Sequence, residues 1–383
     1  MSLLVHSARV VDDGTVTEDG WIHIVDGRVA ASGTGGSWRA RAGDTTVVDA
    51  ADAAGPDAVL TPGFVDLHGH GGGGYSYDDG ADAIRAARDL HRAHGTTRAV
   101  ISLVTAPLEE LTERVRVVSE LTRTDPDVLG AHLEGPFLDP AHKGAHNGDL
   151  LRTPDAASIE TLLAAGAGTV RQITLAPELP GGLDAVRRAV AAGTAVAVGH
   201  TGADAEATAA AFDAGATILT HAFNAMPGLH HRLPGPVGAA LADRRVTLEA
   251  IADGVHLHPE IVRMLCAAAP RRVALVTDAM AAAGAAEGDY LLGGLDVTVR
   301  EGVARIAGTD TIAGSTLTQD AALRVAVGAG APLAVAVEAL TATPARAIGR
   351  PDLGRLSPGA VGDLVLLSSD LQVRGVWIAG VRA

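Results

Sequence analysis

The pattern of apolar and polar positions divides the chain into three parts. Near both ends, short β-branched runs are separated by Asp-Gly or Gly punctuation, as in residues 20–30 and 362–383. Between them, short apolar runs alternate with amphipathic stretches such as 81–95 and 107–123, in which apolar residues recur at helical spacing. Strands that alternate with helices predict a parallel sheet.

The middle part contains eight apolar runs that read as strands. Eight strand–helix units favour a closed (β/α)₈ TIM barrel over an open, doubly wound sheet. The two terminal β segments are far apart in sequence, and we expect them to pair into one small sheet beside the barrel. The predicted barrel strands are residues 63–68, 98–104, 128–134, 172–178, 195–200, 217–223, 247–253 and 272–278.

Polar residues stand where the predicted strands end. Six of the eight runs finish in His, Asp or Glu, and His70 lies just beyond the first of them. In a (β/α)₈ barrel the active site lies at the carboxyl ends of the strands, so these side chains are expected to converge. The candidates taken from these ends are His68, Glu134, Glu178, His200 and Asp278, together with His221, which lies two residues before the end of its run.

The histidine pair in VDLHGHGGGG predicts a metal site. Residues i and i+2 of a strand point to the same side, so His68 and His70 can aim two ring nitrogens at one point. An isolated pair of this kind is more often two ordinary loop histidines. Other strand ends supply three further ligand-type residues: Glu134, His200 and His221. Together with the histidine pair they indicate a site for a divalent metal.

Asp278 ends the last predicted strand, in the segment VTDAM. A catalytic metal lowers the pKa of its bound water towards about 7, and a carboxylate beside that water can take its proton and return it to a leaving amine. We expect this general acid/base role for Asp278. A helix N-cap and a plain metal ligand are the alternatives, and the ligand role is compatible with proton transfer.

Composition narrows the function further. The formal net charge of −15 argues against a protein that binds nucleic acid. The longest apolar runs are too short to predict a membrane span. The chain has a single cysteine, Cys266, and its first residues lack the pattern of an export signal, so a cytoplasmic location is expected.

Several motifs, in order, resemble the N-acetylglucosamine-6-phosphate deacetylases of the amidohydrolase superfamily. They are HGHGG, HLEGPF, HKGAHN, VGHT, THAFNAM, ADGVHLHP, VTDAM and AGSTLTQD, and they span nearly the whole chain. The resemblance implies a barrel over residues 59–355 and a small β-sandwich domain formed by residues 1–58 and 356–383. It also implies a homodimer.

The same resemblance implies roles for the strand-end residues. The main metal would be bound by Glu134, His200 and His221, and a second metal by His68 and His70, with Glu134 bridging the two ions. One or two ions are therefore expected. Zn²⁺ is the first expectation, with Fe²⁺, Co²⁺ or Mn²⁺ as alternatives, because histidine and carboxylate ligands suit all four.

Catalytic and substrate-binding residues follow from the matching motifs. Asp278 resembles the acid/base and also lies where it can bind metal, and His146 resembles the histidine that polarises the substrate carbonyl. The residues expected to contact the substrate, partly across the dimer interface, are Ala145, His146, Asn224, Ala225, Arg232 and His256.

The activity implied is removal of acetate from N-acetyl-D-glucosamine 6-phosphate, which yields D-glucosamine 6-phosphate in amino-sugar catabolism. One alternative is a different amidohydrolase, such as a cyclic amidase or an amino-acid deacylase, which has no need of Arg232 and His256 near a phosphate. The other is a non-catalytic barrel. The presence of every candidate ligand together with Asp278 argues against that alternative.

Overall fold

The computed structural model describes residues 1–383 and contains the predicted parallel barrel. Its eight strands are hydrogen-bonded in chain order, and neighbouring strands are parallel throughout. Each of the eight predicted runs contributes one strand, so the predicted (β/α)₈ fold is confirmed. The strands are β6 (Phe64–Asp66), β9 (Thr96–Val104), β10 (Val128–Glu134), β11 (Val170–Leu175), β12 (Ala195–Val198), β13 (Ile218–Leu219), β14 (Thr247–Ile251) and β15 (Val273–Val276).

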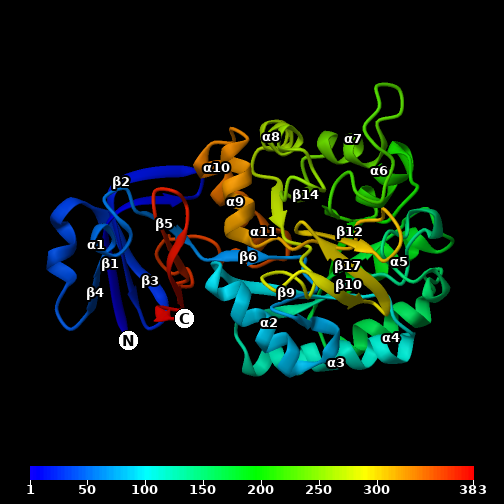
Figure 1. Ribbon diagram of the computed structural model, residues 1–383, viewed down its shortest axis with the longest axis horizontal. Helices are drawn as coiled ribbons and strands as arrows, with labels where there is room; N and C mark the ends of the chain where they lie inside the picture. The colour runs from blue at the N-terminus through cyan, green and yellow to red at the C-terminus, as the bar shows by residue number, and fades with distance from the viewer.

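A helix follows every barrel strand and covers the outside of the sheet (Figure 1). In the second of these helices, Leu111, Val115 and Val118 recur at helical spacing and are completely buried. Burial of this apolar face holds the helix against the strands. The eight helices are α2 (Ala81–Ala93), α3 (Leu108–Thr124), α4 (Ala156–Gly166), α5 (Gly182–Ala191), α6 (Ala205–Asp213), α7 (Gly235–Ala242), α8 (Pro259–Ala268) and α9 (Gln319–Gly328).

The first and last barrel strands meet at their carboxyl ends. The backbone N–H of Asp278 donates to the carbonyl of His68 over 2.7 Å. The hydroxyl of Thr277 donates to the buried carboxylate of Asp66 over 2.6 Å. These bonds place Asp278 beside the histidine pair, although the two segments are two hundred residues apart in sequence.

Strands from both ends of the chain form a separate sheet beside the barrel, with the two termini close together (Figure 1). The order is β21-β20-β19-β5-β1-β2-β3, and β4 pairs with β1. The predicted pairing of the terminal segments is therefore confirmed, while the domain boundaries themselves stay a prediction. The strands are β1 (Ser2–Asp12), β2 (Thr15–Val25), β3 (Arg28–Thr34), β4 (Thr46–Asp49), β5 (Val59–Pro62), β19 (Leu364–Leu367), β20 (Val373–Ile378) and β21 (Val381–Arg382).

A buried ion pair joins the sheet to the barrel. Arg98, in barrel strand β9, donates from Nε and Nη2 to both carboxylate oxygens of Asp363, over 2.6 and 2.9 Å. Asp363 immediately precedes β19. A two-point contact of this kind fixes orientation as well as distance. Three further α-helices are α1 (Ala50–Ala54), α10 (Leu333–Leu340) and α11 (Ala342–Ala347).

A small three-stranded antiparallel sheet between β15 and α9 was not predicted. It consists of β16 (Gly288–Leu292), β17 (Leu295–Arg300) and β18 (Val303–Ile306), and it lies across the barrel at the carboxyl ends of the strands (Figure 1). A short hairpin, β7 (Gly71–Gly72) with β8 (Tyr75–Ser76), follows the histidine pair. None of the helices is both long and apolar enough to cross a membrane.

Candidate active site

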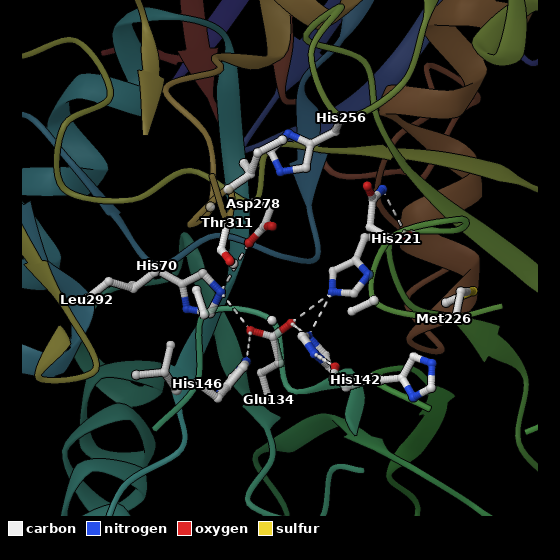
Figure 2. A pocket seen from close by; sticks show the side chains of 18 of the residues that line it. His70, Glu134, His142, His146, His221, Met226, His256, Asp278, Leu292 and Thr311 are labelled. Atoms are coloured by element: carbon white, nitrogen blue, oxygen red, sulfur yellow. Dashed lines mark hydrogen bonds and ion pairs between the residues drawn. The ribbon is translucent and has the colours of Figure 1, made fainter. Parts of the chain in front are cut away.

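The carboxyl ends of the barrel strands bring the predicted ligands together. Glu134 is the last residue of β10, whereas His200, His221 and Asp278 each lie two residues beyond the end of their strand. The side chains of these residues and of His68 and His70 are buried and point into one space, as the labelled members in Figure 2 show.

The backbone is strained where three of these side chains leave their strands. His200, His221 and Asp278 have positive φ angles of 48°, 25° and 47°. Such conformations cost about 1–3 kcal/mol for a residue other than glycine, and they cluster at functional sites. In this barrel they turn the three side chains inward from the strand ends.

The first ligand group consists of His68, His70, Glu134 and Asp278. The Nε2 atoms of the two histidines lie 3.2 Å apart. The Nε2 atom of His70 is 3.1 Å from an oxygen of Glu134 and 3.2 Å from an oxygen of Asp278. Four donor atoms from strands β6, β10 and β15 and the segments that follow them therefore face one another.

The second ligand group consists of Glu134, His200 and His221. The Nε2 atoms of the two histidines lie 3.0 Å apart, and each is within 3.2 Å of the Oε1 atom of Glu134. Glu134 belongs to both groups and lies between them in Figure 2.

The donor atoms fit divalent metal ions. Ligands of a tetrahedral zinc ion at about 2.0–2.1 Å lie about 3.3 Å from one another. The nitrogen–nitrogen and nitrogen–oxygen separations in the two groups run from 3.0 to 3.5 Å. Imidazole nitrogens and carboxylate oxygens are donors that Zn²⁺, Fe²⁺, Co²⁺ and Mn²⁺ accept.

The electrostatics of the site favour a cation. Burial raises the pKa of Glu134 and Asp278, but the nearby charge of His68 and hydrogen bonds from neighbouring histidines together outweigh it and hold the pKa of both carboxyls below the usual range. Burial lowers the pKa of His70, but hydrogen bonds to Asp278 and Glu134 raise it to about 9. Both carboxylates are therefore ionised, and a metal ion competes with protons for the histidine nitrogens.

His146 lies beside the first ligand group. Its Nδ1 atom is 2.9 Å from the hydroxyl of Thr105, which fixes the orientation of the ring. Its Nε2 atom lies 3.4 Å from the Oε2 atom of Glu134 and faces the cavity in Figure 2. A hydrogen-bonding group thus stands next to the candidate metal site, where it can reach an atom bound to the metal.

A cavity of about 470 Å³ opens above the ligands. The volume suits a small ligand such as a sugar phosphate. Its lining includes all the ligand residues except the fully buried His68. It also includes the predicted substrate-contacting residues Ala145, His146, Asn224, Ala225 and His256. Residues Leu292, Asp310, Thr311 and Ile312, from the unpredicted small sheet and the segment after it, complete the wall.

The surroundings of His256, which lines the cavity, favour its protonated ring. Its Nδ1 atom lies 2.7 Å from a carboxylate oxygen of Asp253. Burial lowers the pKa of His256, but that bond and the charge of Asp253 outweigh it and raise the pKa above the ordinary histidine value. No lysine or arginine lines the cavity.

Two predicted positions lie outside the cavity. Arg232 is exposed on the loop before α7, and its Nη1 atom lies 2.7 Å from the ring of His231. Glu178 accepts hydrogen bonds from the hydroxyl of Thr201 and the backbone of Gly202, both over 2.6 Å. Glu178 therefore orders the segment after His200 without joining either ligand group.

Glu249 is a site residue that the sequence pattern did not reveal. It lies in the middle of β14, is fully buried and is 3.1 Å from the Nδ1 atom of His68. The available signal was a single carboxylate inside the apolar run TLEAI. A charged residue in the interior of a buried strand is rare unless it is paired.

Comparisons with known proteins show what the chain is similar to. The family model described as "Amidohydrolase family" matches residues 59–383. A protein of Escherichia coli O157:H7 named N-acetylgalactosamine-6-phosphate deacetylase is 41% identical over 85% of this chain and 88% of its own. The N-acetylglucosamine-6-phosphate deacetylase of Bos taurus is 37% identical, over 84% and 82% respectively.

A solved structure has the same fold over the full length. A mutant of the N-acetyl-D-glucosamine-6-phosphate deacetylase of Mycobacterium smegmatis, in complex with N-acetyl-D-glucosamine-6-phosphate, superposes with a TM-score of 0.93 at 44% identity. The alignment covers 100% of this chain and 99% of that one.

Proposed function

The chain belongs to the amidohydrolase family, and from this we propose that it hydrolyses the acetamide of N-acetyl-D-glucosamine 6-phosphate to D-glucosamine 6-phosphate and acetate. The observation that carries the proposal is the joint position of His70, Glu134, Asp278 and His146 at one end of a cavity whose lining also contains His256. The amide carbonyl of the substrate fits against these four residues, and its anionic group fits against His256.

Proton transfer is assigned to Asp278. Its carboxylate is ionised and exposed to the cavity, so it can take a proton from the attacking water and return it to the nitrogen of the leaving amine. A bound divalent ion supplies Lewis-acid polarisation at this position. His146, oriented by Thr105, donates a hydrogen bond from Nε2 to the substrate carbonyl as negative charge develops on its oxygen.

The phosphate is assigned to the side of the cavity formed by Asn224, Ala225 and His256. Because no lysine or arginine lines this cavity, one protomer offers little charge to a dianion. We propose that the site is completed in a homodimer, by Arg232 of the partner subunit. The loop that carries Arg232 also exposes Leu229 and Leu233, which supports its burial against a second copy.

The identity of the metal and the cellular location of the enzyme are part of the same proposal. We assign Zn²⁺ to the two ligand groups, because paired histidines with a carboxylate are common zinc ligands, with Fe²⁺, Co²⁺ and Mn²⁺ as the alternatives. We assign the enzyme to the cytoplasm, where a single, unpaired and buried cysteine such as Cys266 is stable.

The 4-epimer is a second candidate substrate, because a relative 41% identical to this chain is named for N-acetylgalactosamine 6-phosphate. Measurement of kcat/KM for both sugar phosphates and for unphosphorylated N-acetylglucosamine tests the proposal. A preference for N-acetyl-D-glucosamine 6-phosphate over the other two supports it. A preference for the galactose epimer transfers the assignment to that sugar, and a preference for the unphosphorylated sugar contradicts the phosphate site.

A further inference from the structure

Glu249 is a buried carboxylate whose only ionic partner is a metal-ligand histidine. Its side chain is fully buried, and burying an ionised carboxylate is costly unless the charge is paired and hydrogen-bonded. The one charged partner within ion-pair distance is His68, at 3.1 Å. Gln172 donates from its side-chain amide to the other oxygen over 2.7 Å, and the backbone N–H of His221 approaches at 3.4 Å.

These contacts hold the ring of His68 from behind. Its Nδ1 atom faces Glu249, and its Nε2 atom faces the ligand group, 3.1 Å from Glu134 and 3.5 Å from Asp278. A proton on Nδ1, shared with a carboxylate, leaves the Nε2 lone pair free for a cation. The ring therefore has one hydrogen-bonding face and one ligand face.

No other ligand histidine has a carboxylate behind it. The Nδ1 atoms of His70 and His221 have no hydrogen-bond partner, and Nδ1 of His200 donates to the carbonyl of His142 over 3.0 Å. The chain thus places one extra negative charge behind one ligand of the first group. That charge adds to the negative charge of Glu134 and Asp278.

We infer that Glu249 is a positioning residue that allows the chain to hold an ion at His68, His70, Glu134 and Asp278 in addition to the ion at His200 and His221. A carboxylate on the distal nitrogen fixes the tautomer of a ligand histidine and raises its basicity, and loss of such a partner lowers metal affinity by about 10–100-fold. This inference rests on the proposed metal-dependent deacetylase and deepens it.

Metal content separates this role from a purely structural one. Metal-free wild-type protein and Glu249→Gln are equilibrated with zinc buffers of increasing free concentration, and zinc per chain is measured by mass spectrometry. Wild type should bind two ions. Glu249→Gln keeps the volume and a hydrogen bond but loses the charge, so it should bind one ion with unchanged affinity and the other about 10–100-fold more weakly.

Two control variants show which site has changed. His70→Asn removes a ligand of the first group only, so this variant should keep only the zinc ion of the second group. The affinity for that ion should equal the affinity for the more tightly bound ion in Glu249→Gln. Glu338→Gln neutralises another buried carboxylate, in α10 and paired with Arg271, and should bind both ions like wild type. Equal affinities for both ions in Glu249→Gln and wild type would overturn the inference, as would equal weakening of both sites.

The wild-type protein offers independent tests. ¹⁵N-histidine spectra of the zinc-loaded enzyme should show the His68 proton on Nδ1, a result that does not depend on the folding of any variant. A proton on Nε2 would overturn the inference. Binding of only one zinc by wild type would overturn it too, yet deacetylation of the sugar phosphate by that one-ion enzyme would leave the proposed function in place.

Discussion

The Nε2 atom of His200 lies 3.0 Å from the Nε2 atom of His221, and both lie within 3.2 Å of one oxygen of Glu134. Burial lowers the pKa of His200, so its ring nitrogen is an available lone pair at neutral pH. Lone pairs that converge at this separation are stabilised when a metal ion or a proton lies between them. This geometry accounts for the unfavourable backbone conformations of His200 and His221.

Replacement of Asp278 by Asn should remove most of the turnover while binding of the substrate is retained. The amide has the shape of the carboxylate and tolerates the positive φ of this position, but it cannot accept a proton. We expect kcat to fall by about 10²–10⁴-fold. Steady-state kinetics and calorimetric binding of the sugar phosphate measure the two effects, and wild-type turnover would remove Asp278 from the proton-transfer role.

His146 and Thr105 should both contribute to polarisation of the substrate carbonyl, and the contribution of His146 should be the larger. His146→Gln removes the donor to the substrate carbonyl and should lower kcat by about 10²-fold, with a small change in KM. Thr105→Val removes only the partner of Nδ1, so the decrease in kcat should have the same sign and be smaller. A change confined to KM in either variant would contradict carbonyl polarisation.

Binding of the phosphorylated substrate should weaken as the pH rises. The pKa of His256 is raised by Asp253, so the ring is a cation below that raised pKa and becomes neutral above it. KM for the sugar phosphate should therefore increase with pH in wild type, and His256→Asn should lose this part of the dependence. The unphosphorylated sugar serves as the control, because its KM should lack the same dependence.

Arg232 should act in the active site of the partner subunit. Arg232→Ala and Asp278→Asn chains that are refolded together form mixed dimers. In such a dimer the active site of the Arg232→Ala chain keeps its own Asp278 and receives a wild-type Arg232 from the Asp278→Asn chain. Activity should rise above that of either variant alone. No gain in a mixture shown to contain mixed dimers would place Arg232 outside the partner's site.

Stability should depend on an ion cluster between the first and last barrel helices. Asp320, in α9, contacts His94, Thr318 and Arg324; burial raises the pKa of Asp320, but these contacts outweigh it and hold the pKa well below the ordinary value. The contribution is thus present above the unfolded pKa of about 3.9 and is lost as pH falls towards the folded pKa.

Asp320→Asn measures this contribution. The substitution should lower the free energy of unfolding by about 2 kcal/mol at pH 7, since hydrogen bonds to a charged group are lost. The difference from wild type should shrink in acid. Urea unfolding at pH 7 and at pH 3, below the unfolded pKa, is the measurement, and an equal difference at both values would contradict the assignment.

The barrel and most of its site are predictable because their signals are local. An apolar run ending in a ligand-type residue marks the carboxyl end of a strand, and the barrel topology then brings Glu134, His200 and His221 together. The same argument applied to Glu178 does not place it in a ligand group, because its side chain turns to the backbone of Gly202 instead.

What escaped prediction depends on contacts between distant segments. Glu249 is a charge inside an apolar run, but its role depends on its neighbours His68 and Gln172, which come from distant segments of the chain. The small sheet over the cavity has short strands with mixed exposure, such as Gly288–Leu292, so its pattern carries little signal. Its position above the site follows only from the fold.

The most direct test is the rate of acetate release from N-acetyl-D-glucosamine 6-phosphate beside that from N-acetylglucosamine, before chelation, after chelation and after zinc is restored. We predict strong preference for the phosphorylated sugar, loss of activity with the chelator and recovery with zinc. Inactivity towards both sugars in protein shown to contain zinc, or full activity after complete metal removal, would contradict a metal-dependent sugar-phosphate deacetylase.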